Sequence, residues 1–126
     1  MGKGIKFRAW HRGNKEMRYS WDGWSEDVDV LEELWRIAED AFGYDVMQYT
    51  MLKDKNGNDI YEGDILTEKW KAQVFFEKGM FIVRFHNNPA VNRPCALFDF
   101  MERREKAKTP VGVIGNVYEN PELLNG

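Results

Sequence analysis

The sequence that decides the fold is Gln48-Tyr49-Thr50-Met51-Leu52-Lys53-Asp54-Lys55-Asn56-Gly57-Asn58-Asp59-Ile60-Tyr61-Glu62-Gly63-Asp64-Ile65-Leu66. The Asn56-Gly57 dipeptide predicts a tight hairpin turn of the primed type, because both residues tolerate a positive φ. Polar residues on each side of it keep the tip in water. A strand restarts at Tyr61, and Gly63 within it indicates a bend or bulge of the kind that small barrels need.

Upstream of this stretch, residues 5–10 alternate with period two and residues 16–21 do the same, so the two segments are expected to form a β-hairpin. One face of the first strand carries Ile5, Phe7 and Ala9, and the other carries Lys6, Arg8 and Trp10. Between the hairpin and the central stretch, residues 29–42 place apolar side chains at helical spacing and acidic ones opposite, which predicts an amphipathic helix ending at Gly43.

Downstream, alternating residues 70–76 predict a strand, a turn follows at Lys78-Gly79, and the apolar residues 80–85 predict a buried strand that returns beside the first. Residues 96–101 fit either a strand or a helical turn, and residues 102–108 fit a charged linker or a frayed helix. Residues 111–118 predict a last strand. Asn120 followed by Pro121 then predicts a short helical turn, since proline favours the first helical position.

The length of 126 residues is that of one domain with a real core. We therefore expect a single domain over 1–126, mainly β with one α-helix. Its parts are a hairpin and helix in residues 1–45 and a barrel in residues 46–126.

The net charge of −3 disfavours non-specific binding to nucleic acid, because cationic side chains supply nearly all of that affinity. No apolar run approaches the ~20 residues of a membrane span, and the start of the chain lacks a signal-peptide core. The single cysteine, Cys95, cannot form an internal disulfide, as is typical of a reducing compartment. We expect a cytoplasmic protein that has no membrane partner.

The spacing of Asp54, Asn56 and Asn58 imitates the first ligands of a calcium-binding EF-hand loop. The imitation fails, because Asp59 occupies the position of the required glycine and Ile65 that of the required glutamate. Neither histidine lies in a catalytic or metal-ligand pattern, so we expect no enzyme activity, metal or cofactor. A remote alternative is a hydrolase built from the acidic residues of the central stretch, Asp54, Asp59, Glu62 and Asp64.

Five tryptophans in a short chain favour core packing, but a stacking surface for single-stranded nucleic acid or for proline-rich peptide is an alternative. Trp10 is the best candidate for such a surface, because alternation places it beside Lys6 and Arg8. The same hairpin is also able in principle to pair between two copies of the chain, which leaves a homo-oligomer open.

The chain resembles the YopX family of small bacteriophage and prophage proteins in three blocks, residues 5–10, 48–66 and 113–124. The resemblance implies a β-rich domain whose C-terminal part is an SH3-type barrel, and a phage accessory role without assigned catalytic residues. Two positions depart from the family pattern. His11 replaces an acidic residue, and Met51 replaces a glycine, which predicts a locally altered backbone if that glycine has a positive φ.

We therefore expect a non-catalytic phage accessory protein that binds another protein, of the phage or of the host. Nucleic acid is the alternative partner. The candidate interaction surface comprises Lys6, Arg8, Trp10, Asp54, Asn56, Asn58 and Asp59. The residues expected to serve the fold are Gly57, Gly63, Asp64, Gly115, Asn116 and Pro121.

Overall fold

The computed structural model describes residues 7–19, 43–67, 69–86 and 93–124. The chain divides into two compact units, Met1–Tyr49 and Thr50–Gly126, and each is described by itself. The helix predicted over residues 29–42 lies outside the described residues.

The first unit contains strands β1 (Phe7–His11) and β2 (Glu16–Tyr19), which pair antiparallel. β1 also pairs antiparallel with the first half of β3 (Tyr44–Lys53), so β1 lies between two neighbours. The turn between β1 and β2 is closed by the Lys15 N–H, which donates to the His11 carbonyl at 2.8 Å. Both edges of β1 are therefore hydrogen-bonded to neighbouring strands.

In the second unit, the rest of β3 runs into a loop and then β4 (Asp59–Tyr61). The Gly57 N–H donates to the Asp54 carbonyl at 3.0 Å, and the Asp54 N–H donates to the Asn58 carbonyl at 2.9 Å. Of the Asn56-Gly57 pair, only Gly57 has a positive φ, at 83°. The predicted loop is therefore present, but the predicted primed turn at Asn56-Gly57 is wrong, because the turn spans Asp54 to Gly57.

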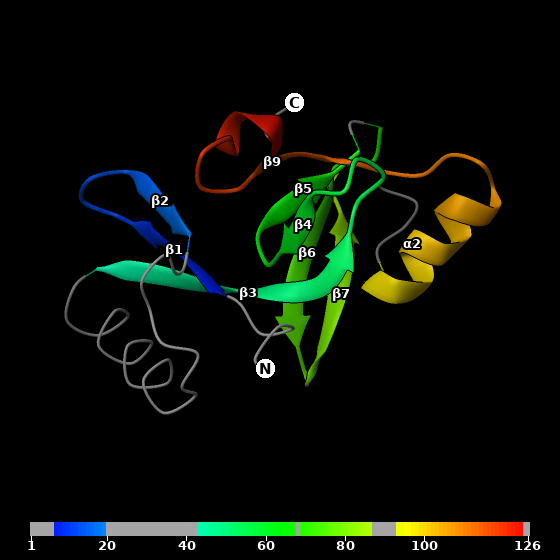
Figure 1. Cartoon of the computed structure of the whole chain (residues 1–126), viewed down its shortest axis with the longest axis horizontal. Coiled ribbons are helices and arrows are strands. Elements are labelled where there is room, and N and C mark those ends of the chain that lie inside the picture. The colour runs from blue at the N-terminus through cyan, green and yellow to red at the C-terminus, as the bar shows by residue number, and fades with distance from the viewer. Residues whose placement is uncertain (1–6, 20–42, 68, 87–92, 125–126) are drawn as a thin grey trace. The chain divides into compact units, whose positions relative to one another are not determined.

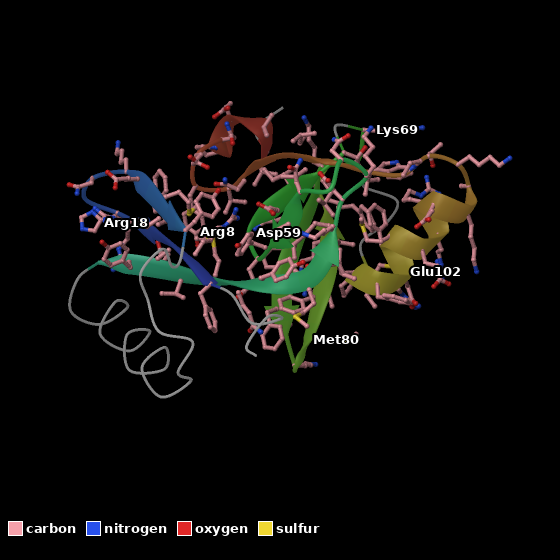
Figure 2. The ribbon with its side chains drawn as sticks, in the orientation of Figure 1. Arg8, Arg18, Asp59, Lys69, Met80 and Glu102 are labelled. Atoms are coloured by element: carbon pink, nitrogen blue, oxygen red, sulfur yellow. The ribbon has the colours of Figure 1, made fainter. Side chains whose placement is uncertain are left out.

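The second unit contains a five-stranded sheet, in the order β8-β7-β6-β5-β9. Its strands are β5 (Asp64–Leu66), β6 (Ala72–Glu77), β7 (Met80–Phe85), β8 (Cys95–Ala96) and β9 (Val113–Asn116). The turn predicted at Lys78-Gly79 is confirmed, and both residues have positive φ. Met80 lies at the free end of the β6–β7 hairpin (Figure 2).

Helix α2 (Leu97–Lys106) follows β8 directly and lies beside β7 (Figure 1). Residues 96–101 and 102–108 each fitted two alternatives in the sequence. In the structure, the apolar residues from Leu97 and most of the charged run that follows belong to this one helix. Leu97 and Phe100 are buried, while Glu102 forms an i,i+4 ion pair with Lys106 at 3.3 Å on the exposed side. Basic residues in the last turn favour this helix end electrostatically.

The core of the second unit lies between its strands and α2. Its buried residues are Ile60, Leu66, Ala72, Val74, Val83, Leu97, Phe100 and Val111. The last element of the described residues is a 3-10 helix, Pro121–Leu124, where the helical turn was predicted. The described part of the chain is mainly β, as expected, and its single α-helix is α2, which is not the helix predicted over residues 29–42.

Candidate functional site

Asp54 lies at the centre of the hairpin loop and holds it to a distant strand. Its Oδ1 accepts hydrogen bonds from the backbone N–H groups of Asn56 at 2.8 Å and Asn58 at 2.9 Å. Its Oδ2 accepts the Val113 N–H at 2.8 Å and the Asn58 side-chain amide at 3.4 Å. The Lys55 N–H reinforces this junction by donating to the Val111 carbonyl at 3.1 Å. One carboxylate thus fixes both the loop and its attachment to β9.

These hydrogen bonds also decide the charge of Asp54. Burial raises the pKa of this carboxyl, but the hydrogen bonds from Val113, Asn58 and Asn56 outweigh it and hold the pKa below its usual value. Because only 7% of Asp54 is exposed, its expected place on an interaction surface is wrong. Its polar contacts serve the backbone of its own chain.

The tip of this loop, residues 55–58, is exposed at every position. It contains two of the candidate residues, Asn56 and Asn58, and it lacks apolar side chains. Asp59 follows at the start of β4 and forms an ion pair with Lys53 at 2.5 Å across the base of the loop. We call residues 55–58 the tip. Its polar groups are presented to solvent on a backbone that Asp54 holds in place.

Asp64 and Gly63 form a second backbone-binding turn. Asp64 is 1% exposed, and its Oδ2 accepts the Tyr61 N–H at 2.8 Å. Gly63 has a φ of 86°, its N–H donates to the Val74 carbonyl, and its carbonyl accepts the Val117 N–H. The turn therefore connects three segments of the second unit.

Asn116 organises the end of β9. Its Oδ1 accepts the N–H groups of Tyr118 at 3.0 Å and Glu119 at 2.8 Å, and its Nδ2 donates to Glu119. Asn120 Oδ1 accepts the Asn116 N–H at 3.2 Å. A Cβ at Gly115 would lie 2.6 Å from that oxygen, so the close approach requires glycine here.

The candidate residues of the first strand are placed differently from one another. Arg8 is 3% exposed, and its Nε donates to Met47 Sδ at 3.4 Å. Its expected place on an exposed cationic face is therefore wrong. Trp10 is half-buried, and Lys6 lies outside the described residues.

Met51 keeps the conformation that its side chain disfavours. It has a φ of 73° and is 58% exposed. The expected departure of the backbone at this position is therefore not found, and Met51 itself adopts the left-handed region.

The junction of Asp54 with Val113 was not predicted from the sequence. Its one signal is Gly112, where a Cβ would lie 3.3 Å from both Asn56 Nδ2 and Lys55 Cε and 3.5 Å from Asp54 Oδ2. In the sequence, this glycine stands in an apolar run that reads as an ordinary strand.

In the described part of the chain, no helix is long and apolar enough to cross a membrane. The same residues also contain no group of three or more His, Cys, Asp or Glu side chains arranged to hold a metal ion.

The fold and these turns place the chain in a class of small, mainly β proteins, in which the polar residues of the sequence motifs accept hydrogen bonds from backbone N–H groups. A family model described as "YopX protein" matches residues 6–125, nearly the whole chain. The chain belongs to the YopX family. It is similar to a solved structure, protein EF1440 from Enterococcus faecalis, with a TM-score of 0.60 and 28% identity over 95% of this chain and 97% of that one. The comparison with curated proteins gave no match.

Proposed function

We propose that this YopX-family chain is a non-catalytic accessory protein of a bacteriophage or prophage. It acts in the bacterial cytoplasm and binds another protein, of the phage or of the host, through the tip. The observation that carries the proposal is the contrast between the exposed residues 55–58 and the buried carboxylate that fixes them.

This contrast supports binding for an energetic reason. A loop already fixed in one conformation loses little further entropy when a partner docks on it. Binding residues are also disproportionately carried by loops on a rigid β scaffold. Asp54 supplies this rigidity, because its carboxylate accepts three backbone N–H groups and one amide.

The second unit fits an SH3-type barrel, which is the finer part of the fold that we propose. The register of β5 against β9 shifts between Ile65 and Leu66, and such a shift bends a strand. Gly63 precedes it with a positive φ. Together they provide the curvature that a small barrel needs.

The same contacts favour a binding role over the remote hydrolase. Asp54 and Asp64 both accept backbone N–H groups and are buried, so their oxygens are committed to turns. The nucleic-acid alternative is also weakened, since it required Arg8 beside Trp10 on an open face, and Arg8 is buried.

The test is site-specific photo-crosslinking in a lysate of the bacterial host. One variant carries the photoreactive residue at Asn56, and a matched control carries it at Lys78, an exposed turn residue of the same unit. We expect a protein that crosslinks from position 56 and not from position 78. That protein, once purified, should bind Asn56→Ala about tenfold more weakly than it binds Lys78→Ala. Equal crosslinking from both positions, or capture of nuclease-sensitive material alone, contradicts the proposal.

A further inference from the structure

We propose that Asn56 is a site of spontaneous covalent modification, deamidation through a succinimide, and that the turn closed by Asp54 sets its rate. Asn56 is followed by Gly57, at an exposed position of the tip. The modification itself does not depend on the proposed function, because it needs only the chain and water.

The atoms that react are adjacent in the chain. The backbone nitrogen of Gly57 loses its proton to solvent and attacks Cγ of Asn56. A C–N bond forms, the bond from Cγ to Nδ2 breaks, and the side-chain nitrogen leaves as ammonia. Water then opens the five-membered succinimide at either carbonyl, giving aspartate or isoaspartate. The step needs no oxidant or reductant.

The space around the dipeptide permits ring closure. A Cβ placed at Gly57 would meet nothing within 4 Å, so open space lies beside the Cα of Gly57. Because residue 57 carries no side chain, it places no steric hindrance beside the nitrogen that attacks Asn56.

Hydrogen bonding limits the rate of succinimide formation in the folded protein. The Gly57 N–H donates to the Asp54 carbonyl at 3.0 Å, so the nitrogen that must lose its proton is engaged in the turn. The Asn56 N–H is held by Asp54 Oδ1 at 2.8 Å, which fixes the backbone on the other side of the reacting carbon. The reaction therefore requires local opening of the turn, and its rate follows the fraction of time that the turn is open.

The products change the tip in two ways. Either product adds a negative charge at position 56, close in sequence to Asp54 and Asp59. Isoaspartate also lengthens the main chain by one carbon, which moves the N–H groups of Gly57 and Asn58 out of register with Asp54. If the proposed function is right, modification lowers the affinity of the tip for its partner with time.

The experiment follows mass gain at the Asn56 peptide by digestion and mass spectrometry, with isoaspartate separated from aspartate by chromatography. The full-length protein is incubated folded in neutral buffer and unfolded in urea. The chain has a second Asn-Gly, Asn125-Gly126, which falls in a different peptide and is scored separately. Asn56→Gln is the blank, because glutamine would have to form a larger ring.

We expect the folded protein to react at Asn56 at least about tenfold more slowly than the unfolded protein, the factor that the charge-assisted hydrogen bond from the Asn56 N–H to the Asp54 carboxylate supplies. Asp54→Ala, kept folded, should recover most of that factor. Gly112→Ala is a second variant, in which the new Cβ presses on Asn56 and Lys55 without removing the carboxylate. It should also accelerate the reaction.

Equal rates at Asn56 in folded and unfolded protein would overturn the control by the turn, and no reaction in urea would overturn the site. Either result leaves the crosslinking test of the proposed function intact. Conversely, failure to find a partner leaves these rates unchanged.

Discussion

Replacing Asp54 with alanine should destabilise the protein more than any other single change in the tip and its flanks. The substitution leaves the N–H groups of Asn56, Asn58 and Val113 without their carboxylate partner. A hydrogen bond to a charged group contributes roughly 1.5–3 kcal/mol, but bonds sharing one acceptor are not additive, and water reaches the exposed loop N–H groups. We therefore expect a loss of about 3 kcal/mol in the free energy of unfolding.

Urea denaturation followed by circular dichroism measures this loss, and an unchanged m value shows that the unfolded state is unaltered. The matched control is Asp59→Asn in the same hairpin, which removes an ion pair with Lys53 whose members are 23% and 57% exposed. Such a pair contributes at most about 1 kcal/mol. A loss below about 1 kcal/mol for Asp54→Ala, or one equal to the control, would refute the structural role of this carboxylate.

Three further changes test other parts of the fold. The pKa of Asp54 in the folded protein is below its ordinary value of 3.8, so the stability that this carboxylate contributes is lost as the pH falls through the folded pKa. As the pH is lowered from about 5 to about 3, the urea midpoint should therefore fall more steeply for the wild type than for Asp54→Asn. Gly115→Ala should cost roughly 1–3 kcal/mol by thermal unfolding, since its Cβ would overlap Asn120 and Leu123 Cδ1. Met51→Gly should raise the melting temperature, because relief of about 1–2 kcal/mol of left-handed strain exceeds the added backbone entropy of glycine; an unchanged or lower value contradicts this.

Local chemistry in the sequence predicted the turns well. Lys78-Gly79 reverses the chain as expected, and Pro121 begins the short terminal helix. The hairpin loop at Gly57 was located correctly, although the wrong turn type was assigned. The choice was decided by the side chain of Asp54, which accepts two backbone N–H groups and so stabilises a longer turn. Rules based on the Asn-Gly dipeptide do not include hydrogen bonds from the backbone to the side chain of a preceding aspartate.

Burial depended on neighbours that no local pattern contains. Alternation assigns Arg8 to the polar face of its strand, yet only 3% of Arg8 is exposed. Alternation separates the two faces of a strand, but it does not say which of them is covered by the rest of the fold. Similarly, the partner of Asp54 is Val113, which lies 59 residues away. Spacing arguments do not reach such distances along the chain.

Two of the three blocks that carry the family resemblance form one structural unit. Asp54 and Lys55 bind the backbone of Val113 and Val111, and the Gly63 carbonyl accepts the Val117 N–H at 2.9 Å. The acidic and glycine-rich character of the central block is thus explained by attachment to the block at the end of the chain. Contacts with a binding partner must then be made by groups that this attachment leaves exposed. In the central block, those groups include the tip, and both the crosslinking test and the deamidation test are placed at Asn56 within it.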